Sequence, residues 1–341
     1  MALPNPIRWG IIGIGRFGRL HARGVESIYG LELAAICNRN QQRLDAAHAE
    51  FPATIASTDY RELLDDPSID AVSITTHWQD HYEVAGAALK SGKHVLLEKP
   101  MASTSDECRQ LVELSQSSRG KFMVGHICRF DPRVSLAKKA IEEGRIGRIV
   151  SMHAKRNLPR APGSLRLDKT SPLMGDGIHD ADLMMWFLGR EPTRVYGRYV
   201  RFNEFRYADV GWAMLEFDDT AIGVVETNWG LPANTPTVID ATLQVIGTDG
   251  MLTIDCSHTG LTILDPNGLK MQDTDYWPEQ YGSLVGVLQN EIAYFANCIR
   301  QDTNPNVITP VEAARAVYVM EAAERAANGG HPVSLRLDSF V

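Results

Sequence analysis

The stretch IRWGIIGIGRFG, residues 7–18, decides the fold expected of this chain. Its first half is apolar enough for a buried strand, and its second half carries the pattern G-x-G-x-x-G, with Gly13, Gly15 and Gly18. That pattern has meaning only where it follows a strand and opens a helix. A helix is predicted here from about Phe17 to Ser27. The stretch therefore predicts the opening strand, turn and helix of an α/β sheet.

Strand and helix signals keep alternating through residue 125. Strands are expected at residues 31–37, 71–74, 94–97 and 121–125, and helices at 41–50, 81–90 and 105–117. Alternation at this spacing is typical of βαβ units, which build a parallel sheet. Residues 1–125 are therefore predicted to form a separate α/β domain.

The pattern changes after residue 125. Long stretches of alternating polarity predict strands at residues 195–202, 211–217, 221–228 and 242–246, while helices are expected at 134–143, 180–188, 285–300 and 310–327. Such alternation is typical of a mainly antiparallel sheet with one face away from the core. At 341 residues, two domains are the sensible expectation. Residues 126–341 are thus predicted to form an α+β domain with a large open sheet.

Composition limits the classes of partner and compartment. The formal net charge is −8, which disfavours nucleic acid or an anionic membrane as partner, because binding phosphates needs a concentrated basic face. Neither a signal sequence nor an apolar run of membrane-spanning length is recognisable. The five cysteines are widely spaced and odd in number, which predicts reduced thiols in a cytoplasmic protein, without disulfides or zinc: Cys37, Cys108, Cys128, Cys256 and Cys298.

The glycine loop predicts dinucleotide binding. Gly13 permits a tight turn, Gly15 lets the backbone approach a pyrophosphate, and Gly18 allows close helix–strand packing. The helix that follows offers free N–H groups to phosphate. We therefore expect the loop, including Arg16 and Phe17, to contact the cofactor. A purely structural strand–helix turn is the less favoured alternative.

Asn38 and Arg39 bear on the choice of cofactor. They end the second predicted strand, twenty residues beyond Gly18, where NAD-preferring proteins usually place a carboxylate that binds the ribose 2′-hydroxyl. Asn38 would not repel a 2′-phosphate, and Arg39 could pair with it. The sequence thus favours NADP, or use of both cofactors. In the alternative, Arg39 stacks on adenine or faces solvent.

The stretch VLLEKP, residues 95–100, marks a second candidate site. An apolar strand ends in Glu98, Lys99 and Pro100. Ligands of open α/β sheets bind at the carboxyl ends of the strands, and a proline there ends the ladder of hydrogen bonds. Lys99 is therefore well placed for chemistry.

These motifs together resemble one family. The chain resembles the glucose–fructose oxidoreductase, inositol dehydrogenase and rhizopine catabolism (Gfo/Idh/MocA) oxidoreductases. The resemblance lies in the glycine loop, in Thr76 and His81, and in the stretches 92–100, 125–130 and 177–182. The resemblance covers nearly the whole chain. It implies a Rossmann domain and a C-terminal sheet domain that often forms homodimers or homotetramers. It also implies NAD(P)-dependent oxidation or reduction of a sugar, inositol or sugar derivative.

By this resemblance Lys99 corresponds to the family's catalytic lysine and His179 to its catalytic histidine. A neutral histidine is suited to take the hydroxyl proton near neutral pH, and a protonated lysine can stabilise the developing negative charge on the oxygen. The resemblance further implies a cis bond before Pro100. It places Thr76, His81 and Glu98 beside the cofactor, with Lys99 touching both cofactor and substrate.

The chain departs from the family pattern beside the histidine. Many members carry an aspartate four residues before it, but that position is Gly175, and the carboxylate is shifted to Asp176. Asp176 is expected to orient His179 or to bind a sugar hydroxyl. Asp180 is expected to cap a helix, whereas Asp182 fits a site role and a structural role equally well.

Three arginines are weaker candidates for binding substrate. Arg129 matches a family position near the cleft, although a structural ion pair fits equally well. Arg156 and Arg160, with Asn157 between them, are expected in a loop after the first strand of the second domain, where a solvated loop is the alternative. Although His77 and His81 are four residues apart, no third ligand accompanies them, so no metal is expected.

Two other functions remain open at this point. In one, a tightly held cofactor passes hydride between two sugars or assists glycoside hydrolysis. In the other, the protein senses NAD(P) or sugar without turnover. The presence of both Lys99 and His179 argues against the second, because a binding module has no need of that pair.

Overall fold

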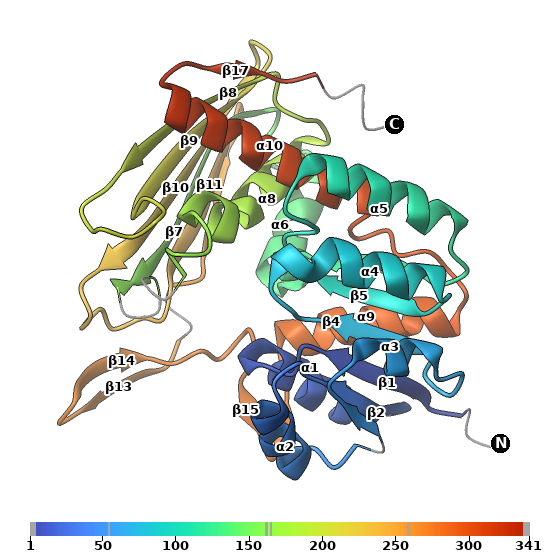
Figure 1. Ribbon diagram of the computed structural model, residues 1–341. Helices are drawn as coiled ribbons and strands as arrows, with labels where there is room; N and C mark the ends of the chain where they lie inside the picture. Colours follow the sequence, from blue (N-terminus) through green and yellow to red (C-terminus); the bar gives the residue numbers. More distant parts are fainter. Residues whose placement is uncertain (1–4, 54, 161–162, 164–165, 258–259, 337–341) are drawn as a thin grey trace. The chain divides into compact units, whose positions relative to one another are not determined.

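The computed structural model describes residues 5–53, 55–160, 163, 166–257 and 260–336 (Figure 1). The chain folds into two units. One contains the residues up to Phe130 together with Asp275–Ala314, and the other contains Asp131–Thr274 together with the residues from Arg315 onward. The chain thus returns to its first unit late in the sequence, whereas a single boundary between residues 125 and 126 was expected.

The first unit is built on a six-stranded parallel sheet with the order β3-β2-β1-β4-β5-β6. The strands are β1 (Ile7–Ile12), β2 (Leu31–Cys37), β3 (Ile55–Ser57), β4 (Ala71–Ile74), β5 (His94–Glu98) and β6 (Phe122–Gly125). The predicted parallel α/β sheet is confirmed. Only β3 was missed, because three residues are too few to show a period. The strand order reverses between β1 and β4, which is where such sheets bind ligands.

Helices accompany this sheet. They are α1 (Arg16–Glu26), α2 (Gln41–Glu50), α3 (Tyr60–Asp65), α4 (His81–Lys90), α5 (Ser105–Ser117) and α9 (Val287–Arg300), with short turns η1 (Trp78–Asp80) and η2 (Ile127–Phe130) and the small hairpin β15 (Glu279–Gln280) and β16 (Ser283–Leu284). Helix α9 comes from the returning segment and lies beside the sheet (Figure 1). Its Phe295 packs edge-on against Trp9 of β1, with ring centroids 6.0 Å apart. The interior of the first unit therefore needs residues from both ends of the chain.

The second unit contains a seven-stranded sheet with the order β12-β11-β7-β10-β9-β8-β17. Its strands are β7 (Ile149–Pro159), β8 (Arg194–Val200), β9 (Val210–Phe217), β10 (Ala221–Leu231), β11 (Asp240–Gly247), β12 (Met251–Asp255) and β17 (Val333–Ser334). Among the described residues of this sheet, only β7 and β10 pair in parallel. The predicted mainly antiparallel sheet is confirmed.

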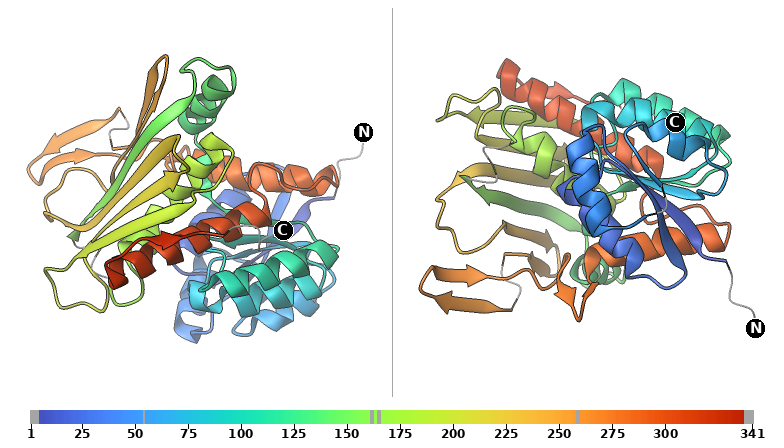
Figure 2. Two further views of the ribbon diagram at one scale, coloured as in Figure 1. Left: turned by 90° about the horizontal axis from the view of Figure 1, so that it is seen from above. Right: turned by 60° about the horizontal axis from the view of Figure 1, so that its bottom comes forward.

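Helices cover one face of this sheet. The helical elements are α6 (Pro132–Glu142), η3 (Leu173–Gly177), α8 (Ile178–Leu188) and α10 (Pro310–Gly329), the last of which crosses the boundary between the units. Gly223 of β10 lies against Met184 of α8, and Gly197 of β8 lies against Ala323 of α10. Figure 2 shows α8 and α10 from two further directions. Residues of the covered face, such as Leu215, are buried.

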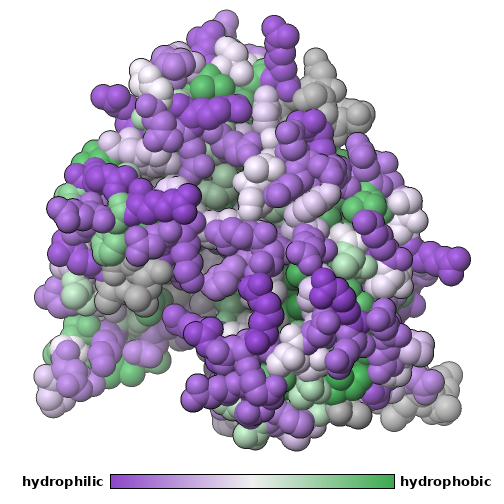
Figure 3. Space-filling view, in the orientation of Figure 1, coloured by the Kyte–Doolittle hydropathy of each residue, from purple (hydrophilic) through white to green (hydrophobic). Residues whose placement is uncertain are grey.

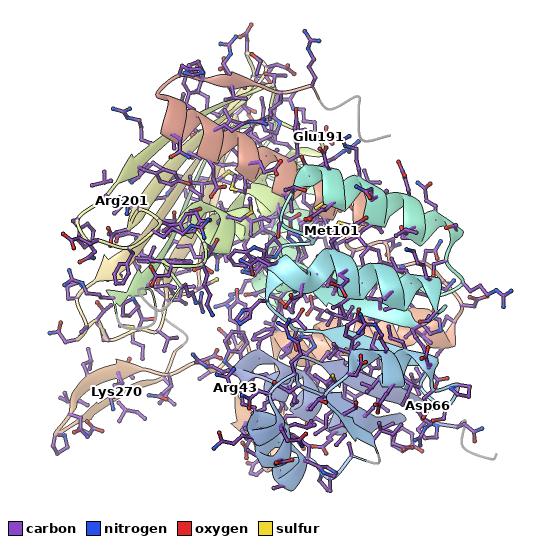
Figure 4. All side chains as sticks on the ribbon, viewed as in Figure 1. Arg43, Asp66, Met101, Glu191, Arg201 and Lys270 are labelled. Atoms are coloured by element: carbon purple, nitrogen blue, oxygen red, sulfur yellow. The ribbon has the colours of Figure 1, made fainter. Side chains whose placement is uncertain are left out.

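A two-stranded hairpin, β13 (Thr262–Asp265) and β14 (Gly268–Met271), follows β12. It exposes Leu264 and Leu269 beside polar residues such as Lys270, which is labelled in Figure 4. In Figure 3 apolar atoms are interspersed with hydrophilic ones in this region. Within the described part of the chain, every helix is too short or too polar to span a lipid bilayer.

Candidate active site

The turn from β1 to α1 is shaped by its glycines. Gly13 has a φ of +99°, and a Cβ there would lie 2.7 Å from the backbone nitrogen of Thr76. A Cβ at Gly18 would collide with the carbonyl oxygen of Gly13. At Gly15, the N-cap of α1, an added Cβ would meet only the Gly13 carbonyl oxygen, at 3.9 Å. Two glycines are therefore required by packing, whereas the third keeps space open.

That open space fits a dinucleotide. The first turn of α1 begins at Gly15, and its backbone N–H groups have no intrahelical acceptor. The Thr76 hydroxyl, which follows β4, is buried and has no hydrogen-bond partner in the described part of the chain. A buried hydroxyl of this kind is costly unless a ligand or water satisfies it. The loop residues named from the sequence thus suit a bound pyrophosphate.

Arg39 does not stand alone at the end of β2. Its Nη2 donates to Asp80 Oδ2 at 2.6 Å, although the Arg39 side chain is 74% exposed. Asn38 Oδ1 accepts a hydrogen bond from the Asn40 backbone N–H at 3.0 Å. A 2′-phosphate here would meet the Asp80 carboxylate as well as the Arg39 guanidinium. The expectation of NADP therefore gains no support from these contacts.

The Glu98 side chain is held by a buried chain of hydrogen bonds. Trp9 Nε1–H donates to Ser73 Oγ at 2.9 Å, and Ser73 Oγ lies 3.1 Å from His21 Nδ1. His21 Nε2 lies 3.2 Å from Glu98 Oε1. Because indole nitrogen only donates, the serine hydroxyl can donate to Nδ1, which leaves Nε2–H to donate to Glu98. Glu98 was expected beside the cofactor, and its carboxylate is bound by His21 of α1, which Ser73 of β4 contacts in turn.

A second carboxyl group lies close to this chain. Glu291 of α9 is fully buried, and neither of its carboxyl oxygens has a hydrogen-bond partner among the described residues. Burial, and then the charge of Glu98, raises the pKa of Glu291 well above its usual 4.5. Burial therefore favours the protonated form of Glu291. Neither His21 nor Glu291 is predicted from the sequence, because nothing in the local pattern of either residue marks it as a neighbour of Glu98.

His81 joins two loops at the carboxyl edge of the sheet. Its Nδ1 lies 2.8 Å from the carbonyl oxygen of Pro100, and its Nε2 lies 3.3 Å from that of Thr76. Burial lowers the pKa of His81, despite these carbonyls and the Glu98 charge. The ring is thus neutral, and the shorter distance makes Nδ1–H the donor. His81 thus holds the two loops in place, and its expected position beside the cofactor stays a prediction.

Lys99 lies directly after β5, at the carboxyl end of the parallel sheet. The bond between Lys99 and Pro100 is cis, as the resemblance implied. Lys99 is only partly exposed, while Met101, labelled in Figure 4, is fully buried. The candidate lysine therefore extends from a well-packed segment of the first unit.

His179 and Asp176 lie on consecutive helical turns of the second unit. Residues 173–177 form a single π-helical turn, which leads directly into α8. Such turns recur at functional sites. His179 and Asp176 are both largely buried. Asp176 Oδ2 accepts a hydrogen bond from Trp229 Nε1 at 2.8 Å and lies 3.6 Å from Arg166 Nη1.

Arg156 and Asp180 form a buried ion pair. Arg156 Nη2 donates to Asp180 Oδ1 at 2.8 Å, and Nε lies 3.2 Å from both carboxylate oxygens. Asp180 lies in the first turn of α8, as expected, and its carboxylate also pairs with Arg156 of the sheet. The loop predicted at Arg156 and Asn157 is wrong, since both belong to β7. Charged residues interrupt the apolar pattern of β7, so the sequence predicts a shorter strand than the structure has.

The other two candidate arginines have different surroundings. Arg129 Nη1 donates to the Val307 carbonyl at 2.7 Å and to Glu312 Oε1 at 2.9 Å, and the side chain is buried. These contacts favour the structural ion pair. Arg160 is exposed, with its guanidinium 5.6 Å from the ring centroid of Phe202. Over the described residues, no group of three or more potential metal ligands is found.

Two family models match this chain. Residues 7–126 match "Oxidoreductase family, NAD-binding Rossmann fold", and residues 134–253 match "GFO/IDH/MocA C-terminal domain". The two matches include the glycine loop and Lys99 in the first case, and Asp176 and His179 in the second.

Similar proteins are found among curated sequences and solved structures. The chain is 30% identical to scyllo-inositol 2-dehydrogenase (NAD(+)) of Bacillus subtilis, over 98% of this chain and 97% of that protein. It is 27% identical to myo-inositol 2-dehydrogenase of Thermotoga maritima, over 77% and 79% respectively. The structure of scyllo-inositol dehydrogenase from Lactobacillus casei with bound NAD(H) and scyllo-inositol gives a TM-score of 0.84 at 23% identity, over 97% and 99%. This structural likeness shows a shared fold.

Proposed function

This chain belongs to the Gfo/Idh/MocA family of oxidoreductases, and on that premise we propose that it oxidises a secondary hydroxyl of an inositol, or of a related polyol or sugar, with NAD. The observation that carries this proposal is the presence of Lys99 and His179 in a chain that is similar to an inositol dehydrogenase from end to end. Neither the glycosidase nor the sensor alternative is favoured by a specific contact.

Each residue has a proposed role in the reaction. Bound NAD supplies the hydride acceptor, its nicotinamide ring. The Lys99 ammonium holds the reacting oxygen and stabilises the negative charge that develops on it. His179 takes the hydroxyl proton at a ring nitrogen. Asp176 binds a hydroxyl of the substrate, and the backbone at Gly15 binds the pyrophosphate.

NAD is the cofactor that we propose, rather than the NADP expected from the sequence. Two observations support it: the ion pair between Arg39 and Asp80, and the NAD(+) in the name of a relative similar over its full length. Next to Arg39, the Asp80 carboxylate would repel a 2′-phosphate and could accept a hydrogen bond from a ribose hydroxyl.

Nicotinamide absorbance tests this function directly. Purified protein should reduce NAD with scyllo-inositol, myo-inositol or a free aldose, and more slowly with NADP. Lys99→Met should lower kcat by about 10²- to 10³-fold, with NADH binding by fluorescence retained. Lys90→Met, on the exposed end of α4, is the matched control and should behave like the wild type. Unchanged turnover in Lys99→Met would overturn the lysine's role.

Assembly and location are also proposals. The face of the large sheet away from α8 and α10 carries exposed or partly exposed apolar side chains: Tyr196, Trp212, Met214, Ile222, Val224 and Ile246. A patch of this kind usually marks a contact surface, so we propose a homodimer or homotetramer through this sheet face. All five cysteines are buried, and their odd number and wide spacing in the sequence support a cytoplasmic location.

A further inference from the structure

Position 175 has no room for a side chain. A Cβ on Gly175 would lie 2.5 Å from Cη2 and 2.6 Å from Cζ2 of Trp229, and 3.3 Å from Cγ2 of Thr170. Trp229 is fully buried and packs in a cluster with Leu158 and Leu167. A rigid ring in a close-packed interior cannot give way cheaply. Trp229 therefore excludes the aspartate that many family members carry at this position.

The same tryptophan holds the carboxylate one residue later. Trp229 Nε1–H donates to Asp176 Oδ2 at 2.8 Å. Arg166 Nη1 lies 3.6 Å from the same oxygen, and the Arg166 guanidinium lies over the Trp229 ring, 5.6 Å from its centroid. A hydrogen bond to an ionised acceptor is stronger than one between neutral groups. Asp176 is thus held by the hydrogen bond from Trp229 and by the nearby positive charge of Arg166.

The anchor itself is rigid. Trp229 belongs to β10, and its backbone N–H donates to the Asp209 carbonyl at 2.9 Å. The Asp209 carboxylate accepts the backbone N–H groups of Phe202 at 2.9 Å and Asn203 at 3.1 Å. The indole is therefore fixed at its backbone and around its ring, so it can place a neighbouring carboxylate with little freedom to rotate.

We propose that Trp229 is a positioning residue that makes Asp176, in place of residue 175, the carboxylate that selects among polyol epimers. The inference rests on the proposed function, in which Asp176 binds a substrate hydroxyl. A carboxylate in a fixed position accepts a hydrogen bond from a hydroxyl of one configuration. In the epimer that hydroxyl points elsewhere, so the carboxylate loses this hydrogen bond. Leaving a buried polar group unpaired is what gives such sites their selectivity.

Two variants and a matched control test the proposal. Asp176→Asn keeps the shape but removes the charge, and Trp229→Phe keeps a ring but removes the N–H donor. Trp186→Phe, a ring on α8 away from this cluster, is the control. Kinetics with NAD on scyllo- and myo-inositol give KM, kcat and the ratio of kcat/KM between the epimers. Binding of each inositol to the NADH complex is followed by tryptophan emission, and thermal unfolding by circular dichroism.

Both variants should raise KM for the preferred inositol by about 10- to 100-fold and reduce the epimer ratio, with a smaller change in kcat. The double variant should be no worse than Asp176→Asn alone, since both changes remove one interaction. NADH binding should stay unchanged. A purely structural cluster would instead lower the unfolding temperature and leave KM and the epimer ratio as in the wild type, which overturns the proposal.

The outcomes separate this inference from the proposed function. If Trp229→Phe does not fold, Asp176→Asn decides alone, because asparagine is nearly isosteric. If the wild type binds inositols in an Asp176-dependent way without turnover, the dehydrogenase function fails and the inference holds. If the wild type turns over and Asp176→Asn keeps the same epimer ratio, the inference fails and the function holds. Failure of both turnover and inositol binding overturns both.

Discussion

At the scale of single residues, neighbouring side chains decide what a charged group can do. Glu98 lies beside the candidate lysine, yet its carboxylate accepts from His21, whose other ring nitrogen faces Ser73. Arg39 follows β2, where a cofactor ribose is expected, yet it pairs with Asp80. The type of a residue limits the chemistry that it can perform, and its hydrogen-bond and ion-pair partners determine which of these roles it has.

Removing the partner of Arg39 should shift cofactor preference. In Asp80→Asn the guanidinium loses a carboxylate at 2.6 Å and becomes available to a 2′-phosphate. Because exposed ion pairs are weak, the ratio of kcat/KM for NADP to that for NAD should rise by only about 2- to 5-fold. Steady-state kinetics with each cofactor measure it. Asp45→Asn, an exposed carboxylate on α2 that accepts from Gln41, should leave the ratio unchanged.

The raised pKa of Glu291 makes folding sensitive to pH. The native protein holds this proton more tightly than the unfolded chain does, so its contribution to stability is complete below pH 4.5. It is lost as the pH rises toward the native pKa. Between pH 5 and pH 8 the wild type should therefore lose stability relative to Glu291→Gln, a neutral variant of the same shape.

Urea unfolding at several pH values checks this sign. Glu113→Gln, on the exposed side of α5, is the matched control and should follow the wild type at every pH. If the difference in unfolding free energy between Glu291→Gln and the wild type does not change with pH, the pKa of Glu291 is not raised in the native state.

At the scale of elements, the space between them decides which residues are allowed. A Cβ on Gly175 in η3 would lie 2.5 Å from Trp229 of β10, whereas a Cβ on Gly86 in α4 would lie 3.7 Å from Leu114 and 3.9 Å from Leu111. The two glycines look alike in the sequence. Gly175 is required because Trp229, 54 positions along the chain, leaves no room for a side chain. Gly86 has room for one, and as a glycine it only weakens its helix.

Alanine should therefore act in opposite directions at these two glycines. Gly175→Ala should lower the free energy of unfolding by about 1–3 kcal/mol, because the new methyl group overlaps the indole. Gly86→Ala should raise it by up to about 1 kcal/mol, because alanine favours the helix. Denaturant unfolding of both variants measures the difference. Equal effects would mean that the Trp229 ring moves aside without cost.

At the scale of the whole molecule, the open sheet face should determine the assembly. Trp212 of β9 is 42% exposed on that face. A lysine in its place would bring charge into the proposed contact between copies, so Trp212→Lys should shift the protein toward monomers in light scattering after size-exclusion chromatography. Tyr29→Lys, at an exposed position in the first unit, is the control. An unchanged mass for Trp212→Lys would overturn the proposed surface.

The sequence by itself determined the parallel and antiparallel sheets, the glycine loop and the cis bond before Pro100 through resemblance. Periodicity, glycine torsions and short motifs are local, so neighbouring residues carry them. Only the tertiary structure decided that His21 binds Glu98, that Arg156 binds Asp180 and that Trp229 excludes a side chain at Gly175 while holding Asp176. These bonded partners lie 24 to 77 residues apart. Strand order and register bring them together, and no local pattern records that pairing.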